Sequence, residues 1–521
     1  MTAPQFMTTL ASSKRNFTMH SSSDLTSTGI FSGLWSMMHA KYIILAIGLF
    51  YAYKIYKSIV VPPNLKHIPA IPFWATLQSF FSGESAAQRN RRLIIPKLEG
   101  NDGIARREMG RHLLPKAVDL REKTLFARFL GNQNIVFQNG DIWKRHRRIT
   151  NPAFHRAMPI KLFSSLASRM FEVFEKEGNF VEVNSVVQRF TLDVIGKAAF
   201  NFNFDVSASM AFNYNLTTSK ILTHKIVTNH WVSTHQALIN PEGGWASAYN
   251  DVINGMDSPL FFLFPFIDNN FRWLFPKRRK VYQKVDILNE LFMTIIEKRK
   301  NEFRKRKNRY IISRDEETDL LTMMIEANQS EADGIGLSDK ELRDNIAIFF
   351  IAGHDTTSIA LSCAMYYLAV NQDMQKKARD EVLRILGDEL HPVAPTLEQT
   401  KDLKYVNAVM KETMRCNPPT ASVMTRVATE DIQLGSHFVP KGSHVVLDIF
   451  AIHHSPQAWE DSERFDPDRF AEGGEYESKA PGSCTWMPFG SQIFKLVAPY
   501  GFDSQRRAKA QLTQPRSPLS L

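Results

Sequence analysis

One segment in the second half of the chain constrains the fold more than any other. Apolar residues recur at helical spacing from 339 to 370, and Ser338 with Glu341 three residues later forms a capping box, which starts a helix. A helix of this length is a rod of about 48 Å, whereas the mean helix has about a dozen residues. Such a rod must cross a whole domain, so we expect one large domain built around it.

The composition agrees with this expectation. The 521 residues are 44% hydrophobic, and no repeat or low-complexity linker follows residue 73. Helical patterns dominate. Strand-like segments are short and confined to 432–450, where the turn residues "LGS" and "PKGS" separate apolar runs as in a hairpin. The fold class is therefore expected to be mostly α with a minor β region.

Charge and cysteine content exclude some classes of function. Lysine and arginine outnumber aspartate and glutamate by 64 to 53, which gives a net charge of +11. This excess is consistent with a generally basic surface, or with one face that binds an acidic partner or an anionic membrane. Without aromatic interleaving or a finger pattern, we expect no nucleic-acid binding. Cys363, Cys416 and Cys484 form no CxxC pair, so neither a disulfide framework nor a structural zinc site is indicated.

The middle of the long helix is polar where a core helix should be apolar. The letters FFIAGHDTTSIAL place Gly353, Asp355 and Thr356 between apolar runs. Glycine costs about 1 kcal/mol in a helix interior but lets a flat group approach the backbone. A threonine can bond back to the carbonyl four residues earlier and open the helix locally. The pattern indicates a functional site, and a polar patch at a helix–helix contact is the alternative.

Three further motifs are short and common when taken singly. KETMR puts Glu412 and Arg415 on one helix face, where a surface ion pair is the ordinary explanation. FDPDRF places Arg469 in a proline-punctuated loop between two phenylalanines. WKRHRR places Trp143 and Arg147 four residues apart on one face of a basic helix.

Together and in this order, the motifs resemble those of the haem-thiolate monooxygenases, the cytochrome P-450 family. The resemblance runs from the N-terminal apolar segment to about Ser491. It implies a mostly helical triangular prism with a small β region and a bound haem. It also implies the insertion of one oxygen atom of O2 into an apolar organic substrate, with electrons from NADPH through a reductase.

The resemblance also implies roles for individual residues. Gly353 would let the long helix approach the haem, Thr356 would hydrogen-bond dioxygen at the iron, and Asp355 would relay protons. The residues implied to lie against the haem are Trp143, Arg147, Arg426 and Phe489. The residues implied to form a buried network on its proximal side are Glu412, Arg415 and Arg469.

The family's proximal motif, Phe-x-x-Gly-x-Arg-x-Cys-x-Gly, begins at Phe489 and then stops. Its cysteine position is Leu496, and no cysteine follows Cys484. A leucine side chain has no lone pair for iron, so no metal ligand can be named, and a thiolate is what favours O–O cleavage. Residues 492–521 show little apolar periodicity. We interpret them as an aberrant tail from a retained intron, frameshift or alternative splice, with genuine divergence as the alternative.

Two interpretations of function follow from this break. One is a monooxygenase whose C-terminal haem-ligand segment is missing or replaced. The other is a non-catalytic truncated isoform or pseudoenzyme.

The N-terminal part is expected to hold the protein on a membrane. YIILAIGLFYAY has no charge, and about 20 helical residues span a bilayer core. We expect the endoplasmic reticulum membrane with the catalytic domain in the cytosol; a mitochondrial membrane is the alternative, because residues 1–23 are rich in Ser and Thr and lack acids. The expected divisions are a polar segment 1–29, an anchor region 30–61, a Pro-rich hinge 62–73, an incomplete catalytic domain 74–491 and the tail 492–521.

Overall fold

The structure is a computed structural model that describes most of the chain between residues 65 and 489. The described residues are 65–98, 106–107, 124–151, 154, 159–177, 180–201, 244–256, 258, 260–261, 265–308, 319–330, 336–389, 393–479 and 484–489, with a few between 42 and 53. The chain divides into two compact units, Met1–Val60 and Val61–Leu521. Most of the expected anchor region 30–61 and the whole tail 492–521 lie outside the described residues.

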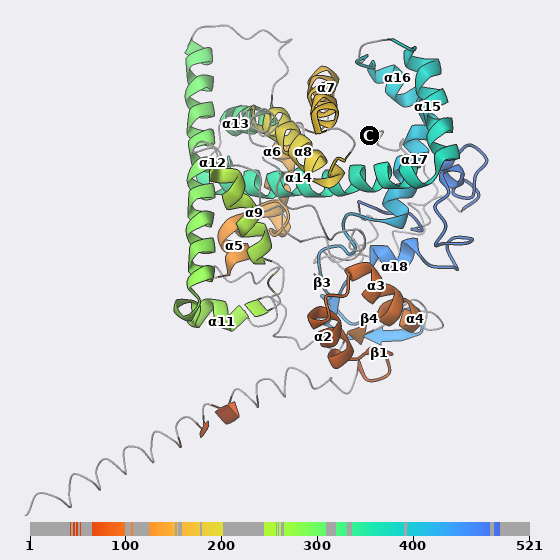
Figure 1. Cartoon of the computed structure of the whole chain (residues 1–521). Helices are drawn as coiled ribbons and strands as arrows, with labels where there is room; N and C mark the ends of the chain where they lie inside the picture. Colours follow the sequence, from red (N-terminus) through yellow and green to blue (C-terminus); the bar gives the residue numbers. More distant parts are fainter. Residues whose placement is uncertain are drawn as a thin grey trace, which may run out of the picture. The chain divides into compact units, whose positions relative to one another are not determined.

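The long helix organises the second unit as expected. Helix α14 (Asp339–Val370) begins at the capping box of Ser338 and Glu341. Figure 1 shows α14 crossing the domain, from α12 (Pro276–Asn308) at one end to α15 (Gln372–Leu386) at the other, and it contacts both.

The largest hydrophobic core lies where α14 meets the helices before it in the sequence. It packs side chains of α5 (Leu125–Leu130), α8 (Val183–Phe200), α9 (Gly244–Met256), α12, α13 (Leu320–Ser330) and α14 together. A second cluster joins the C-terminal part of α14 to α15, α17 (Lys404–Cys416) and Phe465. A third joins α7 (Ile160–Glu177) to α8, with Leu361 and Met365 of α14 against it. The rod thus takes part in all three clusters.

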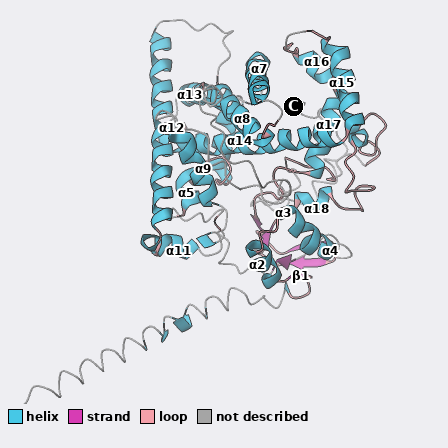
Figure 2. Cartoon of the chain, viewed as in Figure 1, coloured by secondary structure: helices cyan, strands magenta, loops and turns pink. Residues whose placement is uncertain are grey.

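Strands are few and short in the described part of the chain, as Figure 2 shows. Parallel β1 (Ala70–Ile71) and β2 (Arg106–Arg107) form one pair. Antiparallel β3 (Arg426–Val427) and β6 (His444–Val445) form another, and β4 (Ile432–Leu434) and β5 (His437–Val439) form the hairpin expected at 432–450. The mostly α fold class with a minor β region is confirmed.

The remaining elements are short or peripheral. They are α2 (Phe73–Phe81), α3 (Ala86–Arg89), η2 (Asn90–Ile94), α4 (Ile95–Leu98), α6 (Gly140–Thr150), α11 (Pro265–Asn270), η6 (Arg272–Leu274), α16 (Leu397–Asp402), α18 (Ile449–His453) and η7 (Pro467–Phe470).

Candidate functional site

The polar stretch of α14 is helical throughout. The Thr356 hydroxyl donates to the Ala352 carbonyl at 2.6 Å, which is the back-bond that the sequence suggested. The expected local opening is absent, because α14 continues unbroken to Val370. A carbonyl oxygen has two lone pairs, so Ala352 can accept from this hydroxyl without losing its helical hydrogen bond.

The two sides of this stretch differ in burial. His354 and Ser358 are buried, whereas Ala352 and Thr357 are exposed and Thr356 is half-buried. We call the side that carries Ala352 and Thr356 the open face of α14. Because the Thr356 hydroxyl proton points at Ala352, the oxygen's lone pairs are left to accept a hydrogen bond from a molecule on this face.

Asp355, the expected proton relay, has a protein partner that its neighbours in sequence do not supply. The Tyr249 hydroxyl of α9 donates to Asp355, lying 3.2 Å from each carboxylate oxygen. His354 Nδ1 lies 3.7 Å from Asp355 Oδ1 and 3.4 Å from Thr191 Oγ1. Burial lowers the pKa of His354 to about 4, so this imidazole is neutral at neutral pH.

Gly353 lies against a neighbouring helix. A Cβ added at this position would come within 2.5 Å of Ile195 Cδ1 on α8, so the glycine allows α8 and α14 to pack closely. Its expected role beside the haem stays a prediction, and helix packing is the reason for a glycine that this structure supplies.

Helix α6 is joined to the start of α14 by one carboxylate. Glu341, which closes the capping box, also pairs with Arg145 and lies 3.3 Å from Nε2 of the fully buried His146. Trp143 and Arg147 are exposed, and no ion pair to Arg147 occurs in the described part of the chain. Within this part of the chain the Arg147 guanidinium has no carboxylate partner, which would suit an anion such as a propionate.

The residues expected to form the buried network are brought together. Arg415 Nε and Nη2 donate to the two carboxylate oxygens of Glu412 at 2.7 and 2.9 Å, and both side chains are fully buried. Arg469 Nε lies 3.6 Å from Glu412 Oε1. Burial alone would lower the pKa of Arg415, but the Glu412 carboxylate raises it, so the guanidinium stays charged.

The Glu412–Arg415 pair also holds the end of α18 and the segment after it in place. Arg415 donates to the carbonyls of His453, Ser462 and Arg464 at 2.7 to 3.0 Å. A lone surface ion pair, the ordinary explanation for a Glu-x-x-Arg, does not describe this arrangement.

Comparison with known proteins identifies the family. The family model "Cytochrome P450" matches residues 112–491, well over half of the chain. The chain belongs to the cytochrome P450 family.

Curated relatives of this cytochrome P450 come from plants and mammals. It is 26% identical to "Protein LUTEIN DEFICIENT 5, chloroplastic" of Arabidopsis thaliana, over 80% of this chain and 67% of that protein. It is 27% identical to "Cytochrome P450 3A11" of Mus musculus, over 68% of this chain and 64% of that protein. It is also 27% identical to "Cytochrome P450 4A11" of Homo sapiens, over 68% of this chain and 62% of that protein. The chain thus spans about two thirds of the length of these relatives.

A solved structure shows the same fold. "Retinoic acid bound cyanobacterial CYP120A1" is 23% identical, with a TM-score of 0.51, and the match covers 71% of this chain and 70% of that one. At this identity the likeness establishes the fold alone.

The last described segment of this cytochrome P450 is fixed by three hydrogen bonds. Trp459 Nε1 donates to the Thr485 carbonyl and Trp486 Nε1 to the Lys411 carbonyl, both at 3.2 Å, and the Met487 amide donates to His453 Nε2 at 2.9 Å. The segment just before the proximal motif is thus docked on α17 and α18.

Two of the implied haem contacts are exposed. Phe489 is 74% exposed, and Arg426 in β3 is exposed as well. Leu496, at the family's cysteine position, lies outside the described residues.

Two of the three cysteines, Cys363 and Cys416, offer no thiolate. None of the three is in a disulfide. Burial raises the pKa of Cys363 to about 11 and raises that of the buried Cys416 as well, so both are thiols at neutral pH. Among the described residues no group of three or more His, Cys, Asp or Glu could hold a metal ion.

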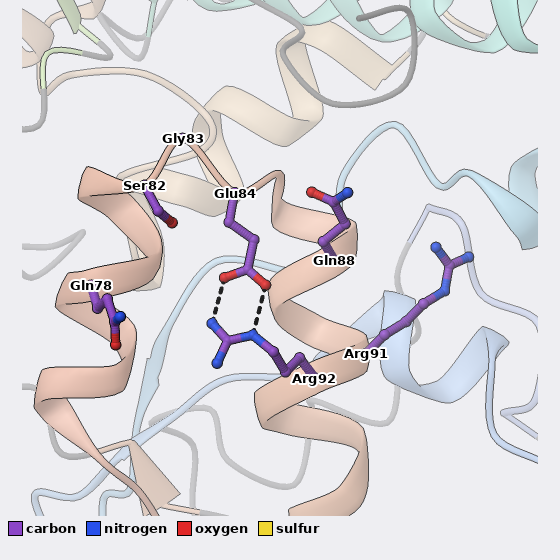
Figure 3. Close-up of a pocket in the computed structure, with 7 residues that line it drawn as sticks. All are labelled: Gln78, Ser82, Gly83, Glu84, Gln88, Arg91 and Arg92. Carbon is purple, nitrogen blue, oxygen red and sulfur yellow. Dashed lines mark hydrogen bonds and ion pairs between the residues drawn. The ribbon is translucent and has the colours of Figure 1, made fainter. Parts of the chain in front are cut away.

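A shallow surface pocket is lined by Gln78, Ser82, Gly83, Glu84, Gln88, Arg91 and Arg92 (Figure 3). Its charged side chains are already paired. Arg92 donates to both carboxylate oxygens of Glu84 at 2.9 and 2.6 Å and lowers the pKa of Glu84 to about 2, and Arg91 pairs with Glu463 at 2.8 Å. This polar pocket does not suit an apolar substrate.

Proposed function

We propose that the domain is built for haem-dependent monooxygenation of an apolar organic substrate, with electrons from NADPH through a reductase. The observation that carries the proposal is the open face of α14. It carries the Thr356 hydroxyl, and the acid Asp355 precedes this threonine in the middle of a core helix. An oriented hydroxyl next to an acid is suited to proton delivery.

The described residues fit one side and the edge of a haem. Arg147 offers a cation that has no ion-pair partner among the described residues, and Trp143 offers an exposed aromatic ring on the same helix, which suits a propionate. When bound, haem supplies the redox centre at which O2 is activated. In this proposal Thr356 accepts a hydrogen bond on the open face, and its hydroxyl would rotate away from Ala352 to pass on its proton. Asp355 would take up a proton from solvent and return it to the threonine oxygen, so the relay ends as it began.

A second candidate, a non-catalytic isoform, rests on Leu496. A hydrocarbon side chain at the thiolate position removes the iron ligand that the family uses, and neither Cys363 nor Cys416 is ionised to replace it. In this case the chain would keep the fold of the domain up to its docked segment and lack turnover.

One measurement separates the two candidates. The reduced-CO difference spectrum is recorded for the full chain with haem supplied, and for a version in which the family's proximal motif replaces the residues after Ser491. We expect a thiolate-type Soret band only in the second protein. A band from the chain as written, at stoichiometric haem, would refute the non-catalytic candidate, and no band from either protein would refute the monooxygenase proposal.

We further propose that the anchor region 30–61 holds the protein in the endoplasmic reticulum membrane, with a mitochondrial membrane as the alternative. The apolar run supports this, as do the exposed Tyr42, Leu45, Leu49 and Tyr53, which are helical. Among the described residues, α14 is the one helix long and apolar enough to cross a membrane, but it is the core helix described above. Carbonate extraction tests the anchor, and release of the full chain into the soluble fraction would refute it. Import of the chain into mitochondria would refute the location in the endoplasmic reticulum membrane.

A further inference from the structure

The contact between Tyr249 and Asp355 links the proposed relay to a distant helix. The two residues are 106 positions apart, and the phenol lies at equal distances of 3.2 Å from the two carboxylate oxygens. A donor shared equally by both oxygens restrains the position of the carboxylate. The Asp355 side chain remains 25% exposed, so part of it is accessible.

Packing leaves the Tyr249 ring little freedom. Tyr249 is 2% exposed, its ring stacks on His354 at 5.5 Å between centroids, and it meets Phe350 edge-to-face at 5.1 Å. Helix α9 itself is packed along α12 and joined to it by the ion pair of Asp251 with Lys284. The hydroxyl is therefore held by two elements that belong to the main core.

The protonation states around Asp355 favour this phenol as a donor. Burial, and then the negative charge of Asp355, raise the pKa of Tyr249 well above its usual value, so the phenol keeps its proton. His354 is neutral, and its Nδ1 lies 3.4 Å from the hydroxyl oxygen of Thr191. A neutral, rigid donor can orient the carboxylate without carrying a charge that would neutralise it.

We infer that Tyr249 is a positioning residue for the relay: its phenol fixes the position of the carboxylate of Asp355, which precedes Thr356 in α14. This inference rests on the proposed function. Without the phenol, the carboxylate loses the hydrogen bond that joins it to α9, and the relay to Thr356 loses this part of its alignment.

The first test needs no haem and uses the full chain, labelled with carbon-13 at its aspartate carboxyl groups. Infrared spectra are compared for the unmodified chain, Tyr249→Phe and Asp355→Asn. The band that disappears in Asp355→Asn should shift in Tyr249→Phe, because carboxylate stretching depends on the hydrogen bonds that the group accepts. An unshifted band would overturn the inference.

Tyr282→Phe is the matched control. Tyr282 is also a buried phenol, 5% exposed, that donates to a carboxylate, Asp268 Oδ2, at 3.0 Å. Its loss removes the same type of hydrogen bond at a place remote from the open face. The band of Asp355 should stay unchanged in this variant.

The second test uses the chain with the family's proximal motif restored after Ser491. Tyr249→Phe should raise the ratio of peroxide to product per NADPH several-fold, Asp355→Asn should raise it further, and the double variant should match Asp355→Asn alone. Tyr282→Phe should leave the ratio unchanged. Effects of Tyr249→Phe and Asp355→Asn that multiply in the double variant would show that the two residues act independently and overturn the inference.

Failure of the proposed function gives a different result. If the restored chain shows no thiolate-type CO band, the monooxygenase proposal fails, and the infrared comparison still decides whether Tyr249 holds Asp355.

Discussion

At the residue scale, the decisive question is which side chains of α14 do more than pack. Thr356 is half-buried, so its hydroxyl, which donates to the Ala352 carbonyl, can also meet a molecule on the open face. Ser358, in contrast, is buried, and its hydroxyl donates to the Asp355 carbonyl at 2.9 Å. A functional role is therefore better supported for Thr356 than for Ser358.

Thr356→Ala in the restored chain should uncouple oxygen use from product formation. Loss of the hydroxyl removes the last member of the proposed relay, and positioned proton transfer contributes on the order of 10²-fold or more to a rate. We expect product to fall by about that factor while peroxide per NADPH rises. Thr357→Ala, at the exposed neighbouring position, is the control. An unchanged peroxide-to-product ratio in Thr356→Ala would remove Thr356 from the relay.

The buried pair of Glu412 and Arg415 gives a prediction of stability. Arg415→Met leaves the Glu412 carboxylate buried without its bidentate partner, so the free energy of unfolding should fall by about 3–5 kcal/mol. Replacing both residues by apolar ones should recover part of that loss. Urea unfolding measures both effects, and a single variant as stable as the unmodified chain would contradict the prediction.

At the element scale, the attachment of α6 to α14 depends on Glu341. Burial alone would raise the pKa of Glu341, but hydrogen bonds from Ser338 and His146 and the charge of Arg145 lower it overall. A carboxyl whose pKa is lowered by folding stabilises the protein above its unfolded value of 4.5, and this contribution is lost as the pH falls below that value.

Glu341→Gln should therefore destabilise the chain in a pH-dependent way. Glutamine can still complete a capping box, so the variant removes the charge and keeps the cap. The melting temperature should be lower than that of the unmodified chain at pH 7, and the difference should shrink as the pH falls through 4.5. Ser338→Ala, which weakens the cap alone, should cost about 1 kcal/mol. A difference for Glu341→Gln that stays constant with pH would contradict the electrostatic explanation.

At the scale of the whole molecule, the proposal that residues 492–521 are an aberrant tail has a consequence for stability. The sequence there shows little apolar periodicity, although a family member should pack a helix behind the haem. Without that helix, apolar core surface would be exposed to water at a cost of about 25 cal/mol per Å². A few hundred Å² would cost on the order of 5–10 kcal/mol, which is comparable with the stability of a domain.

The chain as written should consequently bind little haem and aggregate more readily than the restored chain. Haem stoichiometry by absorbance and light scattering during heating measure the two effects. Equal haem occupancy and equal aggregation in the two proteins would show that residues 492–521 complete the fold, contrary to our expectation.

The sequence by itself determined the features that depend on neighbours along one helix or one hairpin. The capping box of Ser338 and Glu341, the back-bond of Thr356 and the pairing of Glu412 with Arg415 all join residues three or four positions apart. The period of an α-helix brings such residues together wherever the helix lies. The family motifs added the expectation that Arg469, far along the chain, would join Glu412.

Only the tertiary structure decided which helices meet. Tyr249 reaches Asp355 because α9 packs beside α14, Glu341 acquires Arg145 and His146 because α6 docks on the same helix, and Ile195 lies over Gly353. No local pattern marks these partners, since tyrosine and histidine are also ordinary core residues. Contacts between residues about a hundred or more positions apart follow from how the helices pack their apolar faces around α14, and that arrangement is a property of the whole fold.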